Sequence, residues 1–179
     1  MKPINIAVVG ATGAVGEAMI DILESRQFPV DNLYPLASQR SAGKSLQFRG
    51  KHHTVQDLSE FDFSKADIAL FSAGGEVSAT FAPAAAEAGC VVIDNTSHFR
   101  REQDIQLVIP EVNPEAIGGY RQRGIIANPN CSTIQMMLAL QKIHQVLSIK
   151  EIIVSTYQSV SGSGRKGMNE LEVQLKQTN

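Results

Sequence analysis

"INIAVVGATGAVG", residues 4–16, joins a short apolar run to a turn with a glycine at every third position. An apolar strand, a tight turn and a helix, in this order, are typical of the first half of a dinucleotide-binding unit. Gly10 would permit the turn, Gly13 the approach of a pyrophosphate, and Gly16 close packing of the helix on the sheet. The alternative is a turn whose glycines are purely structural.

The rest of the chain alternates apolar runs with amphipathic stretches. Strands are predicted at Ile4–Val9, Leu33–Ala37, Ile68–Ser72, Val91–Asp94, Leu107–Ile109, Gly124–Ala127 and Ile149–Tyr157. Helices are predicted at Ala14–Ser25, Glu76–Ala88, which Pro83 should kink or interrupt, and Ser132–Val146. Because several strands are apolar throughout, we expect an α/β protein with a Rossmann-like, doubly wound, mostly parallel sheet.

Two further segments complete the outline. Residues 45–56, with Gly50 near their centre, are predicted to form a hairpin. Beyond Asn128 come one helix, one strong strand, a glycine- and serine-rich loop and a polar helix. That last part is too short to close a domain, and the strand at Ile149–Tyr157 needs neighbours on its edges. We therefore expect the chain to be a fragment of a longer protein or an unusually small relative.

The composition is that of a globular protein with an ordinary core, 43% hydrophobic and 19% charged over 179 residues. A formal net charge of −2 gives no indication of a nucleic-acid or anionic-membrane partner. The sequence shows neither a secretory signal pattern nor an apolar run of the roughly 18–20 residues that span a membrane. Its two cysteines, Cys90 and Cys131, lack metal-ligand spacing. We expect a cytoplasmic protein without a metal site.

The second predicted strand indicates which dinucleotide would bind. An NAD site needs an acidic residue at the end of this strand, but Ser38, Arg40 and Ser41 stand there instead. One guanidinium and two hydroxyls suit a 2′-phosphate, so NADP is favoured over NAD. The alternative is a solvated loop with an incidental arginine.

Cys131 follows a predicted strand and opens a predicted helix in "NPNCSTIQ", residues 128–135. A helix N-terminus stabilises a thiolate and so increases the reactive fraction of a cysteine placed there. Cys90 begins the apolar run "CVVID" and is expected to be core packing. Position alone leaves Cys131 open as either a small buried residue or a nucleophile.

Six motifs occur along the chain in this order: GATGAVG, SAGG, DNTSHFR, PEVN, NPNCSTIQ and STYQSVSGSGRKG. Together they resemble the amino-terminal half of the bacterial aspartate-β-semialdehyde dehydrogenase family, over essentially the whole chain. NPNCST is the most specific of them. The related N-acetyl-glutamyl-phosphate reductases and glyceraldehyde-3-phosphate dehydrogenases surround their nucleophile with other residues.

The resemblance implies an NADPH-dependent reduction of L-aspartyl-4-phosphate to L-aspartate 4-semialdehyde and phosphate through a cysteine acyl-thioester. It implies that Cys131 is the nucleophile, that Gln158 orients the substrate, and that Arg100 with Asn130 binds the departing phosphate. The cofactor contacts that it implies are Thr12, Gly13, Ala14, Val15, Arg40, Ser41, Ser161 and Gly162.

The resemblance also implies an NADP-binding domain at residues 1–129 and the incomplete start of an α+β catalytic and dimerisation domain at 130–179. The family's catalytic histidine lies downstream, so we expect the isolated chain to bind NADP weakly and turn over negligibly, and the full-length protein to be a homodimer. A non-enzymatic nucleotide-binding paralogue and an N-acetyl-glutamyl-phosphate reductase remain the alternatives.

Overall fold

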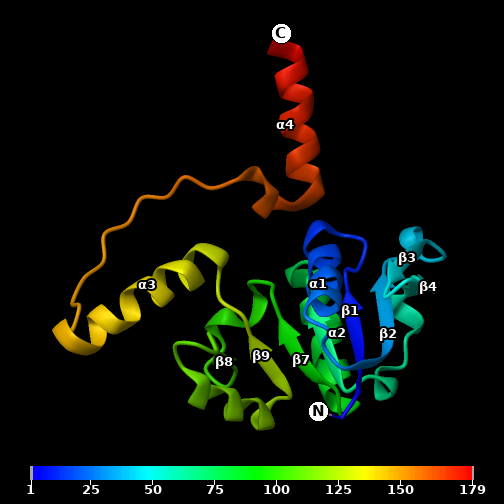
Figure 1. The fold of residues 1–179 in the computed structure, drawn as a ribbon, viewed down its shortest axis with the longest axis horizontal. Helices are drawn as coiled ribbons and strands as arrows, with labels where there is room; N and C mark the ends of the chain where they lie inside the picture. Colours follow the sequence, from blue (N-terminus) through cyan, green and yellow to red (C-terminus); the bar gives the residue numbers. More distant parts are fainter. Residues whose placement is uncertain (1, 179) are drawn as a thin grey trace.

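A computed structural model describes residues 2–178 and contains a parallel sheet of seven strands (Figure 1). From one edge to the other, the strands are β5 (Gln56–Asp57), β2 (Val30–Ala37), β1 (Ile4–Val9), β6 (Ile68–Phe71), β7 (Val91–Asp94), β9 (Ile125–Ala127) and β8 (Gln106–Leu107). From β1 the strand order runs to β2 and β5 on one side and to β6 and β7 on the other, with β9 placed before β8 at that edge. The switch point of this doubly wound sheet therefore lies between β1 and β6. The predicted fold class is confirmed.

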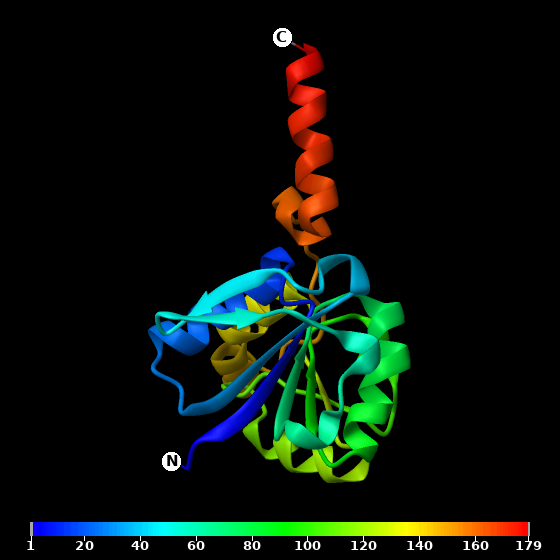
Figure 2. The same cartoon turned by 90° about the vertical axis from the view of Figure 1, so that its right-hand side faces the viewer.

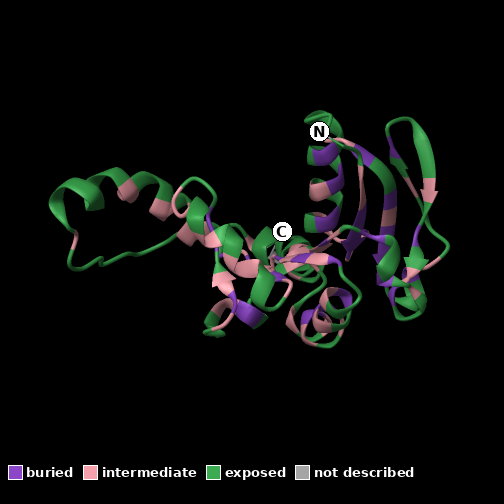
Figure 3. Cartoon of the chain, turned by 90° about the horizontal axis from the view of Figure 1, so that it is seen from below, coloured by how far each residue is buried: buried purple, intermediate pink, exposed green. Residues whose placement is uncertain are grey.

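Both faces of the sheet are covered, which explains why its strands are apolar without alternation. Ile6 and Val8 of β1 face one core, packed with the helix α1 (Ala14–Ser25). Ala7 and Val9 face the other, packed with the helix α2 (Gly75–Glu87). Buried residues accordingly concentrate along the sheet and on the inner sides of the helices (Figure 3).

Helix α2 runs through Pro83, so an interruption at this residue is wrong, whereas the alternative of a kink stays a prediction. Proline removes one backbone donor, but the fully buried Ala82 and Ala85 pack the same turns against the sheet. Packing of these small side chains outweighs the loss of a single hydrogen bond.

The predicted hairpin is confirmed as β3 (Ser45–Phe48) paired with β4 (Lys51–Thr54). Arg49 and Gly50 connect the strands, and both have positive φ angles, 51° and 71°. Positive φ at both central positions matches the right-handed twist of the flanking strands.

The predicted strand at Ile149–Tyr157 is wrong. Residues 148–159 have no regular secondary structure, and Ile153 is 91% exposed. Figure 1 shows this segment crossing from α3 (Cys131–Leu147) to the short 3₁₀ helix η6 (Val160–Ser163) with no strand beside it. A strand is stabilised by hydrogen bonds to a neighbour, and none of residues 2–178 provides one.

The final helix, α4 (Gly164–Thr178), confirms the predicted polar helix and projects away from the sheet (Figure 2). Helix α3 has no buried residue, and its Val146 and Leu147 are 80% and 74% exposed. The sheet with α1 and α2 therefore supplies the packed core, and the part after residue 130 extends from it.

Stability should fall at high pH because of Cys90. Burial, and secondarily the charge of Asp67, raises the pKa of the Cys90 thiol from 9.0 to about 12. Between these values the unfolded thiol loses its proton while the folded one keeps it, so the free energy of unfolding decreases by up to about 1.4 kcal/mol per pH unit. Urea titrations from pH 8 to 11 should give a shallower decline for Cys90→Ala than for the wild type. Parallel declines would contradict this expectation.

Candidate active site

The glycine-rich turn has the geometry that its spacing predicts. Gly10 has a φ of +89°, and a Cβ there would lie 3.0 Å from the backbone nitrogen of Ala73. A Cβ on Gly16 would lie 2.2 Å from the carbonyl oxygen of Gly10, which requires this first turn of α1 to pack directly on the strand end. Neither position accepts a side chain without movement of the backbone.

The N-terminus of α1 lacks a side-chain cap. Gly13 is the N-cap residue and has no side chain to accept from the first-turn N–H groups. Such groups, at the positive end of the helix dipole, bind phosphate oxygens. Helix α3 differs, because the side-chain oxygen of Asn130 accepts from the N–H groups of Ser132 and Thr133 at 3.0 and 3.4 Å.

A cavity of about 540 Å³ opens at the switch point beside this uncapped turn, and we call it the dinucleotide cavity. Thr12 and Gly13 form one side of it, and Ser38, Arg40 and Ser41 form another. Four of the expected cofactor contacts therefore line one cavity: Thr12, Gly13, Arg40 and Ser41. The other four, Ala14, Val15, Ser161 and Gly162, lie outside it.

Sequence reasoning missed the far wall of the dinucleotide cavity. Val77 and Phe81 of α2 supply apolar surface, and Asp57 and Ser59 supply polar groups. Oδ1 of Asp57 accepts from the backbone and the hydroxyl of Ser59 at 3.0 and 2.8 Å. Asp57 belongs to a strand of two residues, too short to recognise from its pattern.

Arg100 spans the carboxyl ends of two neighbouring strands. Its Nε donates to the carbonyl oxygen of Asn128 at 2.9 Å, and its Nη2 donates to that of Asn95 at 3.1 Å. The Asn128 side chain also donates to the Asn95 side chain. Nη1 of Arg100 makes no hydrogen bond within residues 2–178, so the guanidinium is fixed by two nitrogens and has a third available for an anion.

A buried carboxylate organises this loop. Asp94, the last residue of β7, is fully buried and accepts from the hydroxyls of Ser78 and Thr96, each at 2.8 Å. The backbone N–H of Thr96 donates to the same carboxylate at 3.1 Å. Three donors compensate for the loss of water around the charge and hold the turn that carries Asn95 and Arg100. The acidic end of "CVVID" was visible in the sequence, but its burial was not.

Cys131 is the first residue of α3 and is exposed. It follows the loop whose Asn128 carbonyl accepts from Arg100, so the thiol and the guanidinium belong to one edge of the sheet. Gln158, from the far end of the extended segment, donates from Nε2 to the hydroxyl of Ser132. The Ser132 hydroxyl in turn lies 4.0 Å from the Cys131 sulfur. The fold thus brings together the predicted nucleophile and the predicted substrate-orienting amide.

Of the remaining predicted contacts, Ala14 and Val15 open α1, and Ser161 and Gly162 belong to the short 3₁₀ helix η6 that precedes α4. Ser161 donates from its backbone N–H and its hydroxyl to the hydroxyl of Ser159, at 3.3 and 2.9 Å. Arg165 of α4 forms an ion pair with Glu17 of α1. Residues of the last twenty positions therefore contact the helix that begins at the glycine-rich turn.

Cys90 is buried and Cys131 is exposed, so the two thiols should differ in their rates of alkylation. Cys90 is 1% exposed, and its pKa of about 12 leaves almost no thiolate at neutral pH. With limiting iodoacetamide at pH 7, mass spectrometry should find Cys131 labelled at least about 100-fold faster than Cys90. Labelling of a urea-unfolded sample is the control, in which the two rates should converge. Equal labelling of the folded chain would contradict the expectation.

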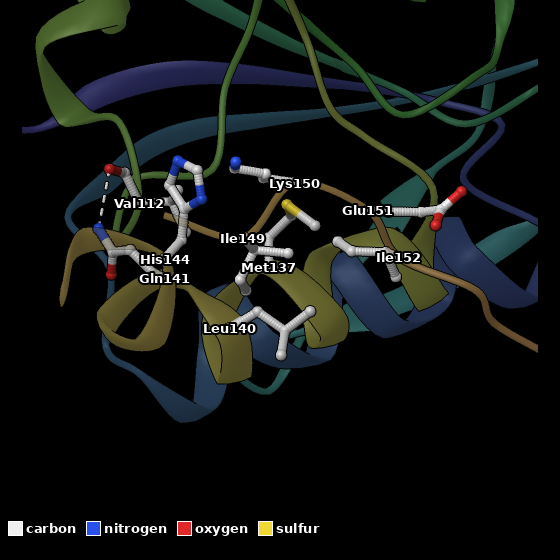
Figure 4. Close-up of a pocket in the computed structure, with 9 residues that line it drawn as sticks. All are labelled: Val112, Met137, Leu140, Gln141, His144, Ile149, Lys150, Glu151 and Ile152. Carbon is white, nitrogen blue, oxygen red and sulfur yellow. Dashed lines mark hydrogen bonds between the residues drawn. The ribbon is translucent and has the colours of Figure 1, made fainter. Parts of the chain in front are cut away.

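A separate cavity of about 370 Å³ lies between α3 and residues 149–152 (Figure 4). Met137 and Leu140 face Ile149 and Ile152 across it, and Gln141 donates to the carbonyl oxygen of Val112 at 3.0 Å. None of the predicted site residues lines this mainly apolar space. The candidate site is therefore formed by the loops at the carboxyl ends of the parallel strands, which we call the rim of the sheet.

Between residues 2 and 178, no three histidine, cysteine or acidic side chains are grouped so that they could hold a metal ion. Over the same range, none of the helices combines the length and apolar character needed to cross a bilayer.

Comparison with known families gives two matches along the chain. Residues 5–120 match the semialdehyde dehydrogenase NAD-binding domain, and residues 140–179 match the semialdehyde dehydrogenase dimerisation domain.

Curated relatives agree with the family matches. Aspartate-semialdehyde dehydrogenase 2 of Vibrio cholerae is 63% identical over 93% of this chain and 50% of its own length. The aspartate-semialdehyde dehydrogenase of Legionella pneumophila is 58% identical over 97% of this chain and 50% of its own. The chain thus spans about half the length of the curated relatives it matches.

Solved structures share the fold. Aspartate semialdehyde dehydrogenase II of Vibrio cholerae, complexed with ASA, superposes with a TM-score of 0.95 at 60% identity, over 97% of this chain and 52% of that one. The enzyme of Candida albicans, solved with NADP, has a TM-score of 0.71 at 29% identity, over 83% of this chain and 48% of that one.

Proposed function

The chain belongs to the semialdehyde dehydrogenase family, and from this premise we propose that it provides the cofactor site and the nucleophile of an NADPH-dependent aspartate-semialdehyde dehydrogenase. The proposed reaction converts L-aspartyl-4-phosphate, NADPH and a proton into L-aspartate 4-semialdehyde, phosphate and NADP⁺. The observation that carries the proposal is an exposed cysteine at a helix start, on the same sheet edge as Arg100 and the glycine-rich turn.

The described residues fit a dinucleotide. The uncapped start of α1 offers backbone donors for a pyrophosphate, and the dinucleotide cavity has room for an adenosine beside Val77 and Phe81. Arg40, Ser38 and Ser41 favour a 2′-phosphate and hence NADP. The nicotinamide, when bound, supplies the hydride. We assign Thr12–Val15, Ser161 and Gly162 to the remaining cofactor contacts.

In the proposed mechanism, Cys131 attacks the acyl carbon of the substrate as a thiolate. A carbon–sulfur bond forms and the bond from carbon to the phosphate oxygen breaks, which gives a thioester and phosphate. Once a hydride from the bound nicotinamide had reduced the thioester, the carbon–sulfur bond would break, releasing the aldehyde and returning Cys131 to the thiolate. Cys131 is exposed at the N-terminus of α3, where a substrate can reach its sulfur. Arg100, with Asn130, binds the phosphate group through the guanidinium nitrogen that has no partner in the described chain.

Gln158 is proposed to orient the substrate from the other side. Its amide contacts Ser132, directly after the nucleophile, and can rotate toward a substrate at the thiol. We place the boundary between the cofactor domain and the catalytic and dimerisation domain at residues 129 and 130. We further propose that the full-length protein is a cytoplasmic homodimer that binds small-molecule substrates and neither nucleic acid nor membrane.

A chimera tests this function. Residues 1–179 would replace the corresponding half of Vibrio cholerae aspartate-semialdehyde dehydrogenase 2, which is 63% identical in the aligned region. With aspartate semialdehyde, phosphate and NADP⁺, the chimera should produce NADPH, followed at 340 nm. Circular dichroism would verify folding, and the unmodified Vibrio enzyme serves as the positive control. A folded chimera that prefers the N-acetyl-glutamate semialdehyde, or uses neither aldehyde, would overturn the assignment.

A further inference from the structure

A second cavity, of about 510 Å³, adjoins the dinucleotide cavity, and we call it the cationic cavity. The two cavities share Thr12, Arg40 and Ser41, so they meet around these three side chains. The cationic cavity adds Lys44, from the loop before β3, and Arg165, from α4. Lys44 and Arg165, more than one hundred positions apart in the sequence, therefore lie at the same place. At this place the 2′-phosphate of a dinucleotide bound in the dinucleotide cavity would project out of that cavity.

The charges in the cationic cavity are unbalanced. The side chains of Arg40 and Lys44 form no hydrogen bond or ion pair with any residue from 2 to 178. Only Arg165 has a partner, since its Nη2 lies 2.5 Å from both carboxylate oxygens of Glu17. Three cations and one carboxylate give a formal charge of +2, which suits a phosphate monoester carrying up to two negative charges.

We propose that Lys44 and Arg165 are specificity-determining residues that, together with Arg40, bind the 2′-phosphate of NADP in the cationic cavity. The inference rests on the proposed cofactor site and goes beyond the contacts expected from the sequence. Arg165 reaches the cavity from the part of the chain that matches the dimerisation domain, so that part completes cofactor recognition.

The ion pair between Arg165 and Glu17 permits this role. Its two side chains are 56% and 51% exposed, and exposed pairs contribute little to stability because water and salt screen them. A phosphate dianion that binds between Arg40 and Lys44 can therefore replace Glu17 as the partner of Arg165, because breaking the ion pair costs little free energy. In this arrangement Glu17 competes with the ligand for Arg165.

The test compares two adenosine ligands that differ only in the 2′-phosphate, 2′,5′-ADP and 5′-AMP. NMR titration of the ¹⁵N-labelled 179-residue chain measures weak affinities and reports in the same spectra whether each variant is folded. Lys44→Gln and Arg165→Gln should each weaken 2′,5′-ADP about fivefold or more, with 5′-AMP changed by less than about twofold. Lys51→Gln and Lys166→Gln, two exposed lysines outside the cavity, should change neither ligand.

The variant Glu17→Gln distinguishes a role of Arg165 in binding the 2′-phosphate from a purely structural role of its ion pair with Glu17. It breaks the same ion pair as Arg165→Gln but leaves the cation free, so 2′,5′-ADP should bind as tightly as before or more tightly. If Glu17→Gln and Arg165→Gln weakened the ligand equally, the ion pair would be merely structural and the inference would be overturned. Equal losses for 2′,5′-ADP and 5′-AMP would also overturn it. If the wild-type chain bound NADPH but the variants showed none of the expected differences in affinity for 2′,5′-ADP, the inference would fail and the proposed function would stand. If the wild-type chain bound neither NADPH nor 2′,5′-ADP, the inference and the proposed function would both be refuted.

Discussion

Replacing Cys131 by alanine is expected to lower kcat of the chimera by at least about 10³-fold, because the reaction loses its covalent intermediate. The loss should fall on kcat, since the cofactor contacts lie in another part of the rim. Steady-state rates of NADPH formation at saturating NADP⁺ measure it. NADPH affinity, followed by the fluorescence of the nicotinamide, should change by less than about twofold.

Two controls refine this expectation. Cys131→Ser retains a hydroxyl of similar size that is far less nucleophilic at neutral pH, so it should be nearly as inactive as alanine. Cys90→Ala removes the other thiol, which is buried in the core and distant from the rim, and should retain most of the activity of the folded protein. Substantial turnover by Cys131→Ala would remove this residue from the mechanism.

Gly16→Ala should destabilise the chain by about 3 kcal/mol or more, or prevent folding. The added Cβ would lie 2.2 Å from the Gly10 carbonyl oxygen and 2.9 Å from the Ala11 Cα, and both are backbone atoms. The clash can be relieved only by moving α1 away from the strand, which opens the core beneath Ile20 and Leu23. Urea unfolding followed by circular dichroism measures the change.

Gly75→Ala is the matched control, because both glycines lie in the first turn of a helix, Gly75 in α2 and Gly16 in α1. A Cβ at Gly75 would meet only the His98 Cβ, at 3.8 Å, an ordinary contact. Alanine also loses less backbone entropy than glycine on folding, so this change should be neutral or stabilise by up to about 1 kcal/mol. Equal destabilisation by the two substitutions would show that the close packing at Gly16 is not the cause.

Much of the fold was predictable because its signals are local. Helix α1 has the predicted bounds, and the strands of the sheet appear within a few residues of their apolar runs. Two predictions failed for reasons that lie outside the segment itself. Pro83 is tolerated because the surrounding alanines are packed on the sheet, and residues 149–157 are not a strand because none of the described residues pairs with them.

The candidate site was predictable only in part. Motifs singled out Cys131, Arg100 and the glycine-rich turn as candidates, and all three lie at or a few residues beyond the carboxyl ends of strands. They did not identify Asp94 as the buried anchor of the Arg100 loop, nor Val77 and Phe81 as a wall of the dinucleotide cavity. Burial of a carboxylate and convergence of distant side chains depend on how the elements pack, and a linear pattern does not record that.

By itself the sequence determined the class of fold and the glycine turn, and it singled out Cys131 as the candidate nucleophile, since periodicity and turn chemistry act between near neighbours along the chain. Only the tertiary structure decided that Arg40, Lys44 and Arg165 surround one cavity and that Gln158 reaches the residue beside Cys131. The physical reason is distance: Coulombic attraction and hydrogen bonding act over a few ångströms in space, whatever the separation in sequence.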